Sequence, residues 1–162
     1  MQLTRFLFIV SMMFVAQASR AGTIINTNGS QEGVAISGYD TVAFFTVKNA
    51  VKGKENYSHE WMGAKWLFAS EENLNLFKAD PEKYAPQYGG NCSVGVSENY
   101  ISRKPANGSF EIVDGKLYLF PAGTNWPDGP YRDWHQRGGG PHKRIRDGDV
   151  NWLKLKQRLE SR

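Results

Sequence analysis

The chain has 162 residues, which is the length of a single domain of ordinary size. Apolar residues make up 40% and charged residues 22%, which excludes a disordered or fibrous protein, and the single cysteine excludes an intramolecular disulfide framework. The net charge of +4 is unevenly distributed, because residues 132–162 carry +5 whereas residues 22–131 carry −3. A basic tail on an acidic body argues against nucleic acid as a partner, since nucleic-acid binding requires a broad basic face.

Residues 1–21 have the pattern of a cleaved signal peptide. Residues 1–5 are short and positive, residues 6–18 are an apolar run of 13 residues, and Ser19-Arg20-Ala21 supplies small residues before a cleavage point at Gly22. A spanning helix needs about 20 apolar residues, so a retained anchor is the weaker interpretation. We expect a periplasmic or secreted protein of about 140 residues after cleavage.

The body of the protein is predicted to begin with a loose polar lead-in over residues 22–35, followed by a domain over residues 36–120. Two segments that contain aromatic residues, residues 59–61 and 65–68, are separated by a short glycine turn at residues 62–64, which is typical of a β-hairpin. Alternation along the strands predicts a common inward face. The expected core is built from Trp61, Trp66, Phe68, Leu74 and Phe77.

Two helix starts follow the hairpin. Ser70 is a favourable N-cap with acidic residues in the first turn behind it, and Asp80 is a second N-cap with Pro81 at the first helical position. Further along the chain, Asp114-Gly115 lies between two apolar segments and predicts a second hairpin.

The C-terminal part is predicted to contain a long loop followed by a helix. Residues 121–149 hold 6 glycines and 4 prolines, which predicts a long irregular basic loop, and residues 150–162 predict an amphipathic helix. Within the loop, the basic residues Lys143, Arg144 and Arg146 are candidates for contact with an acidic surface of the cell envelope, and a solvated loop is the alternative.

Several segments taken together resemble the YHS domain family. They are the sequence GYDTVAFF at residues 38–45, followed by residues 61–70, 80–90 and 112–119, with Asn151-Trp152 at the end. The chain resembles the exported, single-domain YHS proteins of bacteria more than the metal-handling fragments that are fused to heavy-metal ATPases. This resemblance implies an α+β fold, with a treble-clef-like core of one hairpin and one helix, a second hairpin and a C-terminal helix.

The resemblance also indicates what is missing. In the metal-binding relatives, cysteines are expected at the positions that Ala43 and Ala69 occupy here, and a histidine at the position of Trp61. None of these three side chains binds a transition metal, so no cofactor is predicted. The exported branch implies no particular reaction.

Cys92 and His59 remain as candidate metal ligands, because a thiolate and an imidazole suit copper or zinc. A free cysteine is also among the most buried residue types, and it is a nucleophile only beside a suitable base. His135 and His142 are seven residues apart, which is not a helical metal-binding spacing, so they are interpreted as loop residues.

The sequence therefore predicts an exported, non-catalytic YHS-type binding module, and the family suggests metal or redox handling at the cell envelope as its context. Its partner is an unidentified protein or small ligand. One alternative is a copper- or zinc-binding protein that uses Cys92 and His59, and a second is a thiol-dependent enzyme.

Overall fold

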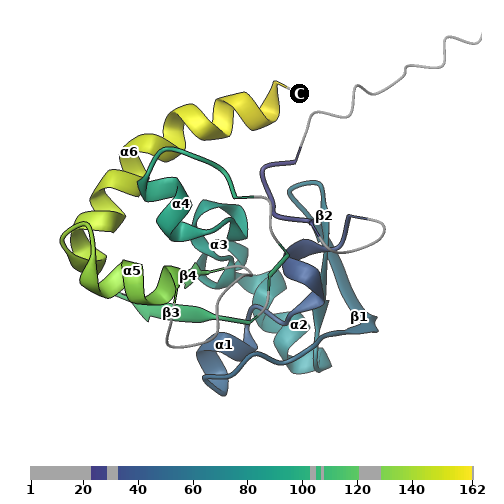
Figure 1. The fold of residues 1–162 in the computed structure, drawn as a ribbon. Coiled ribbons are helices and arrows are strands. Elements are labelled where there is room, and N and C mark those ends of the chain that lie inside the picture. Colours follow the sequence, from purple (N-terminus) through teal and green to yellow (C-terminus); the bar gives the residue numbers. More distant parts are fainter. Residues whose placement is uncertain (1–22, 29–32, 103–104, 107, 121–128, 162) are drawn as a thin grey trace, which may run out of the picture.

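The computed structural model describes residues 23–28, 33–102, 105–106, 108–120 and 129–161. It is an α+β protein with two antiparallel hairpins and a long C-terminal helix (Figure 1), as expected from the sequence. The elements are η2 (Ala35–Gly38), α1 (Ala43–Thr46), β1 (Lys54–Trp61), β2 (Ala64–Phe68), α2 (Glu71–Ala79), α3 (Pro81–Tyr84), η3 (Gln87–Gly90), α4 (Ser93–Ser97), β3 (Phe110–Val113), β4 (Lys116–Leu119), α5 (Pro130–Gln136) and α6 (Gly140–Glu160).

The first hairpin confirms the predicted strands and their inward face. Met62 and Gly63 both have positive φ angles, of 50° and 71°, as a tight two-residue hairpin turn requires. His59 pairs with Trp66 across the strands, and the rings of both residues lie against Phe77 of α2. Phe77 also contacts the rings of Trp61 and Phe68, so one aromatic side chain of α2 covers the inward face of the hairpin.

The two predicted helix caps are also present. The Ser70 side chain accepts a hydrogen bond from Asn73 N at the start of α2, and the Asp80 side chain accepts one from Lys83 N at the start of α3. A local signal is sufficient for such caps, because donor and acceptor are three residues apart in the chain.

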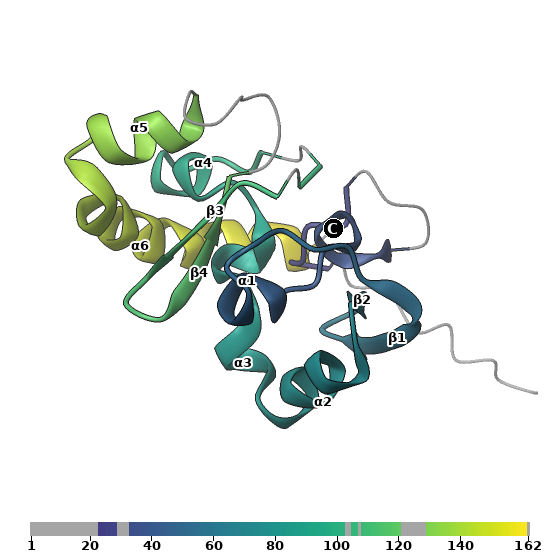
Figure 2. The ribbon, with the colours of Figure 1, turned by 90° about the horizontal axis from the view of Figure 1, so that it is seen from below.

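The second hairpin turns at Asp114-Gly115, where the φ angles are 50° and 74°. Its inward residues Leu117 and Leu119 join the cluster around the first hairpin, whereas Tyr118 and Phe120 join a second cluster with α4, α5 and α6. Figure 2 shows the consequence. The first hairpin and α2 occupy one end of the molecule, α5 and the start of α6 occupy the other, and α6 runs back from there so that Leu159 reaches the first cluster.

The predicted division of the C-terminal part is wrong. Residues 130–149 are mostly helical, since α5 spans Pro130–Gln136 and α6 begins at Gly140, ten residues before the predicted helix start at residue 150. Glycines and prolines suggested a loop, yet Pro141 lies in the first turn of α6, where proline is well tolerated. Gly148 lies inside the helix at a position with no room for a side chain, because a Cβ atom there would come within 2.6 Å of the Tyr88 hydroxyl.

The predicted loose lead-in is also wrong for residues 23–28. Ile24 and Ile25 are buried in the core cluster of the first hairpin. Asn26 N donates to Gly89 O at 2.7 Å, and the Asn26 side chain donates to Gly90 O at 3.1 Å. The segment therefore belongs to the folded unit, and its polar composition conceals two core residues.

The predicted signal peptide lies outside the described residues. Among the residues that the structure describes, no helix has the length and apolar character needed to cross a bilayer.

Candidate functional site

A buried carboxylate lies at the centre of the YHS-like part of the fold. Asp40 is fully buried, and its Oδ1 accepts hydrogen bonds from Val42 N at 2.9 Å and Ala43 N at 3.2 Å. Its Oδ2 accepts hydrogen bonds from Ala69 N at 2.8 Å and from Asn73 Nδ2 at 2.7 Å. One side chain thus connects the start of α1 to the end of the first hairpin and the first turn of α2.

A second polar residue strengthens the same loop. Thr41 is fully buried, and its hydroxyl donates a hydrogen bond to the carbonyl oxygen of Tyr84 at the end of α3. A buried carboxylate is costly unless its oxygens accept hydrogen bonds, and here four N–H groups supply them. The loop of residues 39–42 is therefore fixed by polar contacts to three separate elements.

The residues at the expected metal positions do not fit a metal. Ala43 and Ala69 carry only methyl groups, and their backbone N–H groups both point to the Asp40 carboxylate. The Trp61 ring packs edge-on against the rings of Trp66 and Phe77. No side chain at these three positions offers a donor atom to a transition metal.

The candidate ligand Cys92 lies at the N-terminus of α4. Only 4% of its surface is exposed, and it packs in the second hydrophobic cluster. Tyr100 lies near it: burial raises the pKa of the Tyr100 hydroxyl, and Cys92 contributes to the same shift.

The candidate ligand His59 lies elsewhere, on β1. It is partly buried, and its ring lies 6.2 Å from the ring of Phe77, centroid to centroid, in an edge-on arrangement. Phe77 belongs to the cluster of the first hairpin, whereas Cys92 belongs to the other cluster, so the fold places these two candidates in different clusters. Within the described ranges, no group of three or more His, Cys, Asp or Glu side chains is arranged to hold a metal ion.

Arg144 is not a surface residue of a basic loop. It is buried in α6, its Nε donates to Asp133 O at 2.9 Å and Arg137 O at 3.1 Å, and its Nη1 donates to Ser97 Oγ at 2.8 Å and Glu98 Oε1 at 3.1 Å. The guanidinium group therefore joins α4, α5 and α6. The predicted contact of Arg144 with an acidic surface is wrong, because the side chain is used inside the protein.

The two histidines interpreted as loop residues both lie against the second hairpin. His135 Nε2 is 2.9 Å from Glu111 Oε2, and the more exposed His142 Nδ1 is 3.8 Å from Asp114 Oδ2. Their spacing in the sequence gave no indication of these pairs, since each acidic partner is more than 20 residues away along the chain.

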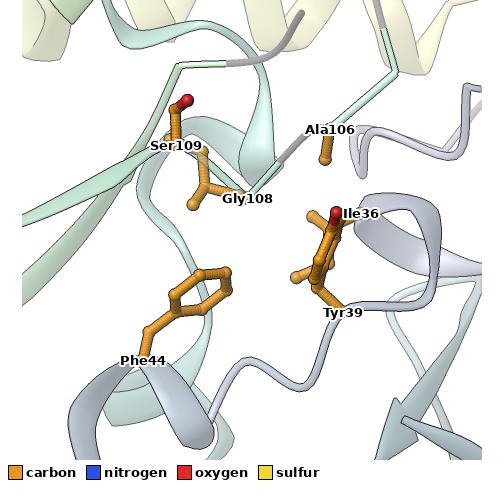
Figure 3. Close-up of a pocket in the computed structure, with 7 residues that line it drawn as sticks. Ile36, Tyr39, Phe44, Ala106, Gly108 and Ser109 are labelled. Carbon is orange, nitrogen blue, oxygen red and sulfur yellow. The ribbon is translucent and has the colours of Figure 1, made fainter. Parts of the chain in front are cut away.

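A narrow apolar hollow separates α1 from the segment before β3 (Figure 3). The rings of Tyr39 and Phe44 form two of its sides. The space between its walls is about 180 Å³, which includes the part that opens to solvent. The hollow is nowhere wide enough for a water molecule. The hollow is therefore a packing seam between elements in this conformation. Its lining is Ile36, Tyr39, Phe44, Ala106, Gly108, Ser109 and Leu119.

The fold and the polar centre at Asp40 define a small α+β protein whose hairpin and helix are tethered by a protein carboxylate. In a comparison with known protein families, the model of the YHS domain matches residues 45–88. The match is consistent with the YHS resemblance that the motifs indicate. The match lies inside the predicted range 36–120 and covers the first hairpin, α2 and α3. Neither the curated proteins nor the solved structures yielded a match.

Proposed function

We propose that this protein is a non-catalytic YHS-type binding module of the cell envelope, whose core is held together without a metal ion. The observation that carries the proposal is the tether at Asp40. It joins the backbone at Ala43 and at Ala69, the two positions where the family resemblance places thiolate ligands. The protein itself supplies the connection between loop and hairpin.

The core around this tether is sufficient for folding. Trp66, Phe68 and Phe77 are each at most 1% exposed, and the rings of Trp66 and Phe68 lie against Phe77 at centroid distances of 5.3 and 5.0 Å. Burial of such large aromatic side chains contributes about 2–3 kcal/mol each to stability. A domain with this core does not depend on a metal site for its stability, in contrast to small zinc-dependent domains.

The location in the envelope rests on the signal-like pattern of residues 1–21. The binding role rests on analogy with other YHS domains. The same analogy suggests metal or redox handling as the context in which the protein works. The partner is a protein or a small ligand. The copper or zinc alternative has less support, because the His59 ring lies against Phe77 of the first cluster whereas Cys92 packs in the second.

The proposal is tested by the substitution Asp40→Asn, with Asp114→Asn as the matched control. An asparagine side chain in place of the Asp40 carboxylate would turn an NH2 group toward backbone or side-chain donors. Together with the loss of charged acceptors, this should reduce the free energy of unfolding by about 2–4 kcal/mol. Asp114 is exposed and lies in a turn that suits asparagine equally well, so the control should change stability by less than about 0.5 kcal/mol.

Urea unfolding of both variants should be measured before and after exhaustive treatment with a chelator. We expect the same stabilities in both states, and a low metal content in protein purified from its native compartment. A wild-type protein that loses several kcal/mol on chelation, or an Asp40→Asn variant as stable as the control, would refute the metal-independent core.

A further inference from the structure

Helix α6 lies along the outside of the molecule and exposes one long face (Figures 1 and 2). Its 21 residues correspond to a length of about 32 Å. The inner face buries Arg144, Gly148, Leu155 and Leu159 against the rest of the protein.

The opposite face carries two apolar residues that the fold does not cover. Val150 is 64% exposed and Leu153 is 67% exposed, and they are among the most exposed large apolar residues that the structure describes. With Arg146 before them and Gln157 after them, they follow a spacing of four, three and four residues. This spacing places all four side chains on a single stripe of the helix.

Part of the charge on α6 is used within the helix. Lys143 Nζ lies 2.6 Å from Asp147 Oδ2, and Lys156 Nζ lies 3.8 Å from Glu160 Oε1. Asp149 is also engaged, because it accepts a hydrogen bond from the hydroxyl group of Tyr88 at 3.0 Å.

Three cations of α6 remain available. Arg146, Lys154 and Arg158 are exposed, and none of them forms an ion pair among the residues that the structure describes. Arg146 lies on the stripe of Val150 and Leu153, and Lys154 and Arg158 lie to one side of it. The outer face of α6 is therefore a combination of uncovered aliphatic side chains and unpaired positive charge.

We propose that this outer face of α6 docks on an anionic lipid surface. Val150 and Leu153 reach the boundary between headgroups and acyl chains, while Arg146, Lys154 and Arg158 contact the lipid phosphates. This goes beyond the proposed function, because it assigns the module a surface on which it works and names the residues that contact it.

The shape of the face favours a lipid surface over an acidic protein. An exposed helix is convex, and its two short aliphatic side chains provide no large aromatic anchor of the kind that dominates protein interfaces. A helix that lies on a membrane requires only an apolar strip with cations beside it. The charge is complementary, since each cation near an anionic bilayer increases binding about fivefold.

The test is sedimentation of the full chain with vesicles of 30% phosphatidylglycerol in phosphatidylcholine, and with vesicles of phosphatidylcholine alone, at low salt. The variant Arg146→Ala/Lys154→Ala/Arg158→Ala should bind the anionic vesicles about 100-fold more weakly than wild type. All variants retain residues 1–21, so any binding by that apolar segment is common to them and does not distinguish them.

The matched control is Lys54→Ala/Lys78→Ala/Lys116→Ala, which removes the same net charge from exposed positions on other elements. It should weaken binding by no more than about threefold. The proposal is overturned if the control weakens binding as much as the α6 variant does, if wild type does not prefer anionic vesicles, or if the protein binds only an acidic protein and no vesicles.

A second readout reports which face touches the lipid. An environment-sensitive fluorophore attached to Leu153→Cys should shift its emission to the blue when anionic vesicles are added, because the native Cys92 is buried and Leu153 is exposed. The same label on Lys116→Cys should not shift. Equal shifts at the two positions, or none at residue 153, would contradict docking through α6.

Discussion

Replacing Arg144 by alanine removes the group that connects the three C-terminal helices. Its Nε donates to the carbonyl oxygens of Asp133, within α5, and of Arg137, just beyond the end of α5. Its Nη1 donates to Ser97 and Glu98 at the end of α4. A cation at the end of a helix also interacts favourably with the helix dipole. The substitution therefore affects the contacts of α5, α4 and α6 together.

The cost can be estimated from these contacts. The pair with Glu98 alone contributes less than about 1 kcal/mol, because the Glu98 side chain is 49% exposed. The hydrogen bonds from the buried guanidinium to carbonyl groups are stronger, because the donor is charged. Their loss removes this donor from both carbonyl oxygens, and Asp133 O keeps its hydrogen bond from Arg137 N. We expect Arg144→Ala to lower the free energy of unfolding by about 3–5 kcal/mol. Arg144→Lys keeps the charge but loses the planar fork, so it should cost about half as much.

Urea unfolding followed by tryptophan fluorescence measures the effect, since Trp134 of α5 is fully buried. The matched control is Arg146→Ala on the same helix, which should change stability by less than about 0.5 kcal/mol because Arg146 is exposed. If the two variants differ by less than about 1 kcal/mol, the hydrogen bonds of Arg144 do not hold the three helices together.

Three further expectations follow from the fold. Phe68→Ala should cost about 3–5 kcal/mol in a urea melt, because the ring is fully buried, whereas Val47→Ala at an exposed site should cost under about 0.5 kcal/mol. Burial and, secondarily, Asp149 raise the pKa of Tyr118 to about 12, so its contribution to stability is complete below pH 10 and is lost between pH 10 and 12. Tyr118→Phe should reduce the loss of stability in that range, and the remaining loss comes from other buried tyrosines such as Tyr88, whose pKa is also raised. Intact mass of exported protein should show the loss of residues 1–21, and full-length protein in a membrane pellet would contradict cleavage.

Features with a local cause could be predicted from the sequence. The turns at Met62-Gly63 and Asp114-Gly115 and the caps at Ser70 and Asp80 depend on residues a few positions apart. The pattern of side chains along a strand was sufficient to place Phe68 in the core, since alternation alone determines which side faces inward.

Features set by distant contacts could not be predicted. Arg144 is followed by Ile145 and Arg146 in a basic stretch that suggests a solvated surface, and only the arrival of α4 and α5 makes it a buried connector. Gly148 indicates a loop when the sequence alone is considered. The helix has a glycine there because the hydroxyl group of Tyr88, 60 residues earlier in the chain, leaves no room for a side chain. The composition of the C-terminal part therefore predicts an irregular segment, whereas tertiary contacts make it mostly helical.

The candidate site, too, could be predicted only in part from the sequence. The family motif located the loop that contains Asp40, but nothing in the sequence indicates that its carboxylate accepts hydrogen bonds from both Ala43 N and Ala69 N. Cys92 and His59 are candidate ligands by chemical type alone. Side-chain type cannot show that two residues pack in different clusters.

The central claim is that the YHS scaffold is retained here without strong metal binding. A competition titration with a Cu(I) chelator of nanomolar strength tests it most directly, performed on wild type and on Cys92→Ser. A site with at most two protein donors should release its copper to the chelator, and both proteins should behave alike. Stoichiometric copper that wild type keeps against the chelator, and that Cys92→Ser does not keep, would contradict the account.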